Sequence, residues 1–127
     1  MKVIKKRICG EERVLCYSLR VTKAVTEKYG KGIREKLKDS STEETLDVVI
    51  WLLAQMLQAG KKYADKIGMP CPPAPSEEDM LDCYGLDDLS ELYGTFTETM
   101  QAGAEQSVEA ESKNGEATRE DQTVPRG

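Results

Sequence analysis

The residues best suited to chemistry in this chain are four cysteines, at positions 9, 16, 71 and 83. Six residues separate the first pair and eleven separate the second, and neither spacing matches a zinc-binding pattern. The chain has no histidine, which is the commonest general base and the commonest metal ligand. A cysteine–histidine nucleophile, a serine–histidine–aspartate triad and a histidine metal site are therefore excluded for this chain alone, and no cofactor is expected.

Carboxylates are the second set of candidate catalytic groups. They concentrate in residues 77–82 and at Asp87 and Asp88. General acid–base catalysis requires two carboxyl groups that are held in a cleft with their pKa values shifted apart. Both clusters instead fall at the starts of predicted helices, where negative charge complements the helix dipole. Because capping accounts for these acids, we expect a binding protein rather than an enzyme.

The candidate residues for protein binding lie in the apolar segment Leu46–Leu57, LDVVIWLLAQML, which holds the only tryptophan of the chain. At helical spacing, one face carries Leu46, Val49, Ile50, Leu53, Ala54 and Leu57. The other side carries Val48, Trp51 and Leu52. A helix that is apolar nearly all round is either a central core helix or a membrane span. A span needs about 20 apolar residues, so the segment is predicted to be a core helix.

Two readings are open for the face formed by Val48, Trp51 and Leu52. Burial against the other helices of the protein is favoured. The alternative is a surface that receives a partner, because exposed apolar patches mark interaction sites. A second stripe with helical spacing is also a candidate interaction site, although such stripes more often belong to the core: Leu89, Leu92, Tyr93, Phe96 and Met100.

Charge is distributed unevenly along the chain, whose net charge is −5. Residues 1–38 contain 12 basic and 4 acidic residues, whereas residues 39–102 contain 3 basic and 13 acidic residues. A basic arm could bind nucleic acid, but Tyr17 and Tyr29 are its only aromatic residues and it carries no known nucleic-acid-binding motif. Attraction between the two halves, or ordinary solvation, is the simpler explanation, so a protein partner is favoured over nucleic acid.

The elements that would position these residues form one mainly helical domain, residues 1–102, followed by a disordered acidic tail, residues 103–127. Within the domain, a small helical bundle is expected around a central helix at about 42–67. An N-terminal β-hairpin, residues 2–17, is predicted to turn around Cys9–Glu12. The remaining helices are expected at 19–29, as a weak turn at 32–38, at about 77–83, and, after a cap at residue 87 or 88, up to about residue 102.

Local signals define the ends of these helices. Ser18 is a candidate N-cap for the helix that starts at Leu19. The central helix is predicted to start at a capping box, either Ser41 with Glu44 or Ser40 with Glu43. It can end at Gly60, but continuation to Ile67 is favoured, because an isolated glycine costs only about 1 kcal/mol.

Beyond the central helix, a proline-rich connector leads to two further helices. Gly68 ends the central helix and Met69–Pro75, MPCPPAP, forms a stiff extended spacer. Ser76 with Asp79 caps the next helix, and Asp87 or Asp88 caps the last one. The helix after Ser76 is expected to turn three residues inward: Met80, Leu81 and Tyr84.

The N-terminus, MKVIKKRICG, is charged and lacks the apolar segment of a secretory signal. The protein is therefore expected to stay in the cytoplasm. In that reducing compartment its cysteines are predicted to be thiols rather than disulfides.

The order of these segments resembles that of a known family. A hairpin with a glycine turn leads into a helix that ends in EKYG (Glu27–Gly30). Three segments follow in order: LDVVIWLLAQMLQAGKKYA (Leu46–Ala64), SEEDMLDCYGLDDLSEL (Ser76–Leu92) and SVEAESKNGEAT (Ser107–Thr118). Over most of residues 2–118 this pattern resembles the small tail assembly chaperones of long-tailed, non-contractile phages and prophages of Gram-positive bacteria.

The resemblance implies an assembly factor that is absent from the finished virion. Such chaperones bind the tape measure protein, a long helical protein, and keep it soluble until tail tube subunits polymerise around it. The partner implied by the resemblance is thus the tape measure protein, in the cytoplasm of a bacterial host. The tail tube protein and further copies of the chain are additional candidate partners. Two alternatives stay open: a small structural or connector protein that remains in the virion, and a regulator that binds nucleic acid through the basic N-terminal third.

Overall fold

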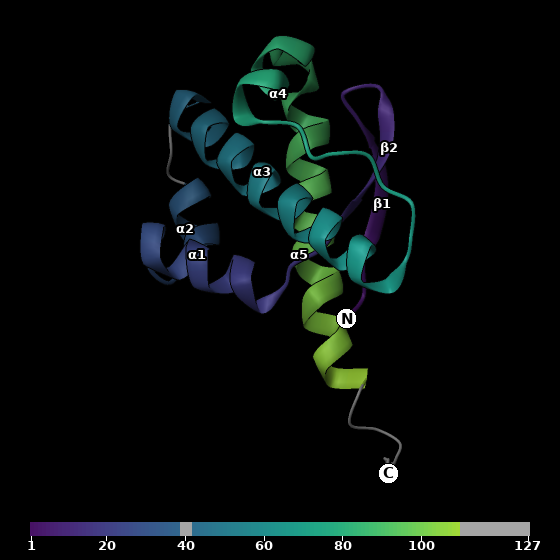
Figure 1. Ribbon diagram of the computed structural model, residues 1–127. Helices are drawn as coiled ribbons and strands as arrows, with labels where there is room; N and C mark the ends of the chain where they lie inside the picture. Colours follow the sequence, from purple (N-terminus) through teal and green to yellow (C-terminus); the bar gives the residue numbers. More distant parts are fainter. Residues whose placement is uncertain (39–41, 110–127) are drawn as a thin grey trace.

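The computed structural model describes residues 1–38 and 42–109, which are mainly helical and begin with a two-stranded antiparallel sheet (Figure 1). The elements are β1 (Ile4–Ile8), β2 (Glu11–Leu15), α1 (Leu19–Tyr29), α2 (Ile33–Lys38), α3 (Thr42–Ile67), α4 (Glu77–Cys83), the 3₁₀ turn η1 (Leu86–Asp88) and α5 (Leu89–Glu109). Strand β2 and helices α1, α2, α4 and α5 all contact α3. In Figure 1, α1 and α2 lie on one side of α3, and the hairpin lies on the other. No helix in the described ranges is long and apolar enough to cross a membrane.

The predicted hairpin is confirmed, and its register pairs Ile4 with Leu15 and Ile8 with Glu11. Its turn is shorter than expected, because only Cys9 and Gly10 lie between the strands. Both have positive φ, 52° and 86°, which is the backbone geometry of a two-residue turn that matches the twist of the strands. The prediction that the turn extends through Glu12 is therefore wrong, and β2 already begins at Glu11.

Helix α3 continues through Gly60 to Ile67, as the favoured alternative predicted. The glycine has a packing role that local sequence does not reveal. A Cβ atom on Gly60 would lie 1.9 Å from the carbonyl oxygen of Val14, so β2 lies directly on the helix at this point. Close by, the backbone N–H of Cys16 donates to the carbonyl oxygen of Met56 over 3.3 Å. The hairpin is thus anchored on the central helix, as an otherwise marginal two-stranded sheet requires.

The connector after α3 is held by two side chains from other elements. Arg13 of β2 donates from Nη1 to the carbonyl oxygen of Pro73, and from Nε to that of Ile8 over 2.8 Å. Lys61 of α3 donates from Nζ to the carbonyl oxygen of Cys71 over 2.8 Å. These bonds fix the path of the extended segment that leads to α4.

Helix α4 begins at the predicted capping box. The backbone N–H of Asp79 donates to Oγ of Ser76 over 3.0 Å, and the N–H of Ser76 donates to the Asp79 carboxylate over 3.1 Å. Ser18 occupies the N-cap position of α1, but its side chain makes no capping hydrogen bond. The other candidate caps, Ser40 and Ser41, lie outside the described residues.

Helix α5 begins directly after Asp88, as predicted, but it extends beyond its predicted C-terminal end. The carboxylate of Asp88 accepts from the N–H of Gly85 over 2.9 Å, so it caps the 3₁₀ turn, and α5 begins after it at Leu89. At the other end the helix passes the predicted end near Ala102 and reaches Glu109. The reason is tertiary: a Cβ atom on Gly103 would lie 3.0 Å from Cβ of Tyr17, so this part of α5 packs against the domain. Residues 110–127, the remainder of the predicted tail, lie outside the described residues.

Candidate protein-interaction site

The face predicted from Val48, Trp51 and Leu52 is largely internal. Val48 and Leu52 are 3% and 0% exposed, which confirms the favoured reading of burial against the other elements of the protein. They are therefore inaccessible to a partner in the folded protein, and the alternative reading is wrong for these two residues. Only Trp51 retains partial exposure.

The stripe along α5 is divided between core and surface. Leu92 and Phe96 are buried, whereas Leu89, Tyr93 and Met100 are half-buried. Tyr93 and Phe96 pack edge to face with their ring centroids 5.7 Å apart. The middle of the stripe thus belongs mainly to the core, and its N-terminal end, at Leu89, lies nearer the surface.

An apolar cleft lies where the first half of α3, α4, η1 and the start of α5 meet. Its volume is about 140 Å³. The walls are formed mainly by six aliphatic side chains: Leu46, Ile50, Leu81, Leu86, Leu89 and Leu92. Met80 also lines it and is fully buried, so α4 is anchored to the core immediately beside the cleft. The cleft brings Leu89 and Leu92 of the predicted stripe together with the central helix.

Two leucines of this cleft are unusually open to solvent. Leu81 of α4 is 53% exposed and Leu86 of η1 is 70% exposed. The prediction that Leu81 points inward is therefore wrong: Met80 takes the inward position on this short helix, and Leu81 lies at the surface. Sequence reasoning missed both residues as site candidates. The available signal was their composition, since each is a leucine within a strongly acidic segment, where solvation alone would favour polar side chains.

A second cavity, of about 170 Å³, adjoins the cleft and shares Ile50 and Leu81 with it. Tyr29 and Trp51 form one wall, with their rings edge to face and their centroids 5.5 Å apart. Lys28 lies over both rings, with Nζ 5.3 Å from the centroid of Trp51 and 5.6 Å from that of Tyr29. Trp51, predicted as a site residue, therefore lines a surface cavity that adjoins the cleft.

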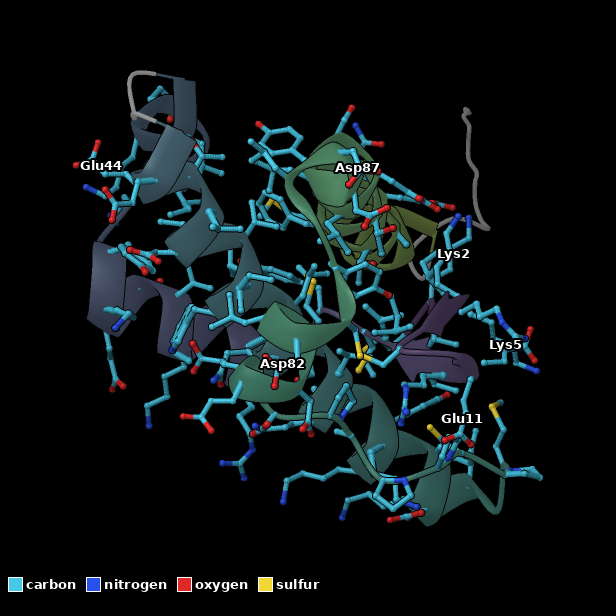
Figure 2. All side chains as sticks on the ribbon, turned by 90° about the horizontal axis from the view of Figure 1, so that it is seen from above. Lys2, Lys5, Glu11, Glu44, Asp82 and Asp87 are labelled. Atoms are coloured by element: carbon cyan, nitrogen blue, oxygen red, sulfur yellow. The ribbon has the colours of Figure 1, made fainter. Side chains whose placement is uncertain are left out.

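Acidic side chains line the aromatic cavity and are also present on α4 and η1, which help to form the cleft. Asp47 and Glu77 line the aromatic cavity, and both are exposed. Figure 2, which views this end of the molecule from above, shows Asp82 on α4 and Asp87 near the start of α5. None of these four carboxylates forms an ion pair with another described residue. Burial raises the pKa of the Tyr29 hydroxyl, and the charges of Asp47 and Glu77 raise it further.

The thiols lie outside this site or at its edge, and all four cysteines are free. Burial raises the pKa of Cys16 to about 11, and burial together with the neighbouring Cys83 raises that of Cys9 to about 12. Both thiols are thus protonated at neutral pH and are poor nucleophiles. Among the described residues, no group of three or more cysteine or acidic side chains is placed to hold a metal ion.

The arrangement is suited to binding an apolar row of side chains between α4 and α5. The cleft offers aliphatic walls and two exposed leucines, with an aromatic cavity at one side, and three of the helices that form it, α3, α4 and α5, are anchored by buried residues. Comparisons of the chain with protein-family models, with curated proteins and with solved structures gave no match.

Proposed function

We propose that this chain is a tail assembly chaperone, which binds a tape measure protein and keeps it soluble in the bacterial cytoplasm during phage tail assembly. In this proposal the helices form a small bundle around α3 that presents the apolar cleft at one end. The resemblance in segment order supplies the family. The observation that carries the binding role is the exposure of Leu81 and Leu86 at the cleft.

The chemistry of the cleft fits such a partner. A long helical protein that awaits assembly exposes leucine-rich stripes, and a groove between helices can cover one stripe at a time. Leu81 and Leu86 would lose contact with water on binding, at about 25 cal/mol for each Å² of apolar surface removed from water. A single small cleft gives weak binding, and several copies along one rod would together cover it. Contacts with the tail tube protein or with further copies of the chain belong to the same proposal.

The test is co-expression of the tagged chain with the tape measure protein of the same phage or prophage, the long helical protein that this proposal expects to be encoded downstream. The measured quantities are the soluble fraction of that protein and the amount recovered with the tag. The wild type is expected to raise both. The double variant Leu81→Ser/Leu86→Ser is expected to lose both effects while remaining folded, because neither side chain is buried.

Leu19→Ser is the matched control, because Leu19 is 88% exposed on α1 and lines neither cavity. It should behave as the wild type does. Failure of the wild type to solubilise or bind the long protein would overturn the proposed function. Recovery of the chain in stoichiometric amount from purified virions would support a structural connector, and a shift of a DNA fragment in a gel would support the nucleic-acid regulator.

A further inference from the structure

The two adjoining cavities differ in chemistry, and this difference restricts what can occupy them. The cleft between α4 and α5 is lined by aliphatic side chains together with Met80 and Tyr84, and it has no charged residue in its lining. The cavity on the other side of Leu81 combines two aromatic rings with the carboxylates of Asp47 and Glu77. An occupant that extends across Leu81 therefore meets leucines first and acidic groups next.

Carboxylates outnumber cations among the residues that line the aromatic cavity. Asp47 and Glu77 line the aromatic cavity, and Asp82 and Asp87 directly follow the cleft residues Leu81 and Leu86 in the sequence. Lys28 is the one cation on the wall of that cavity, and its Nζ lies over the rings of Tyr29 and Trp51. Neither Asp47 nor Glu77 has a cationic atom within 4 Å in the described structure, so both carboxylates are available to a ligand.

We propose that the occupant of the cleft is an amphipathic helix of the bound protein whose leucine stripe is flanked by lysine or arginine. Asp47 and Glu77 select this helix by charge. The proposal rests on the proposed function in that the bound protein supplies the helix. It adds the class of segment that is recognised: leucines enter between Leu81, Leu86 and Leu89, and a flanking cation reaches the aromatic cavity.

Helical spacing makes the two contacts compatible. Residues three or four positions apart lie on the same face of a helix, about one turn from each other. A leucine in the aliphatic cleft and a lysine or arginine one turn away would span the shared wall at Ile50 and Leu81. A flanking glutamate in the same place would meet Asp47 and Glu77 and be repelled.

Two synthetic helical peptides of about five turns, without tryptophan, test the inference. Both carry the same leucine stripe; one has lysine at the flanking positions and the other has glutamate. Binding is measured through the fluorescence of Trp51, the only tryptophan of the chain, which lines the aromatic cavity. The lysine peptide is expected to bind about tenfold more tightly at low salt, because two exposed charge pairs each contribute modestly. Added salt should reduce the difference.

The double variant Asp47→Asn/Glu77→Gln should lose most of this preference. Glu12→Gln, which removes an exposed charge on the hairpin, should keep it. Equal affinity of the wild type for both peptides, no binding of either peptide, or an unchanged preference in the double variant would each overturn charge selection. Loss of binding to the downstream protein in Leu81→Ser/Leu86→Ser, combined with equal peptide affinities, would leave the proposed function intact. Preference for the lysine peptide, without any binding of that protein, would support charge selection and would overturn the proposed function.

Discussion

Gly60 of α3 lies so close to Val14 of β2 that a Cβ atom on the glycine would be 1.9 Å from the carbonyl oxygen of Val14 and 2.5 Å from its carbonyl carbon. The atoms in the way belong to backbone, which cannot rotate aside as a side chain can. The contact therefore fixes both the identity of residue 60 and the position of the hairpin on the central helix. In a free helix the same glycine would only weaken the structure.

Substitution of Gly60 by alanine is expected to destabilise the protein although alanine is the better helix former. Overpacking against the backbone costs about 1–3 kcal/mol, which exceeds the gain of about 1 kcal/mol in helix propensity. The matched control is Gly94→Ala in α5, where a Cβ atom would meet nothing within 4 Å. That change should raise the free energy of unfolding by about 0.5–1 kcal/mol. Urea denaturation measures both, and a stabilised Gly60→Ala protein would contradict the close contact.

Arg13 is expected to be the polar residue on which stability depends most. Its guanidinium is buried, joins the hairpin to the connector through the carbonyls of Ile8 and Pro73, and lies 3.5 Å from the carboxylate of Glu11. Arg13→Met would leave both carbonyls without this donor and should cost about 2–4 kcal/mol. Arg13→Lys should recover only part of the loss, because an ammonium lacks the planar fork that reaches two carbonyls.

Glu11 provides the control for this prediction, because its side chain is 63% exposed. Glu11→Gln should change the free energy of unfolding by less than about 0.5 kcal/mol. If Glu11→Gln lowered the free energy of unfolding as much as Arg13→Met does, the stabilisation by Arg13 would come from its ion pair with Glu11 rather than from its hydrogen bonds to the two carbonyls. Urea denaturation of Arg13→Met, Arg13→Lys and Glu11→Gln in one buffer at fixed salt distinguishes the ion pair from the carbonyl hydrogen bonds as the source of stability.

Cys16 is expected to make stability sensitive to alkaline pH. Burial raises the pKa of its thiol from 9.0 to about 11, so the folded state holds this proton more tightly than the unfolded chain does. The resulting stabilisation is complete below pH 9 and is lost as the pH rises through 11. The free energy of unfolding of the wild type should therefore fall more steeply across this interval than that of Cys16→Ala. Below about pH 8 the two curves should run parallel, and parallel curves throughout would refute the assignment.

Features with a local cause were predictable from the sequence. The capping box of Ser76 and Asp79 depends only on residues three positions apart, and the hairpin depends on the turn at Cys9 and Gly10. The central helix was predictable because its apolar residues occupy both faces over many turns. Each of these signals is contained within one continuous stretch of the sequence, so no other element had to be known.

Features with a tertiary cause were not predictable. Gly103 has the appearance of a helix end, but it lies against Tyr17, and α5 continues to Glu109. On α4, which is only seven residues long, spacing could not choose between Met80 and Leu81 as the buried residue. The choice depends on how α4 meets α3 and α5. The cleft, which residues from four elements form, was hidden for the same reason.

Leu52 and Leu81 should therefore respond in opposite ways to truncation. Leu52 is fully buried in the core, so Leu52→Ala is expected to lower the free energy of unfolding by about 2–5 kcal/mol. Leu81 is 53% exposed, so Leu81→Ala should change it by less than about 0.5 kcal/mol while weakening the binding of the lysine-flanked peptide. Thermal denaturation and the fluorescence titration of Trp51 separate the two effects. A Leu81→Ala protein that is as unstable as Leu52→Ala would show that Leu81 belongs to the core. That result would contradict the proposal that the cleft is a binding site.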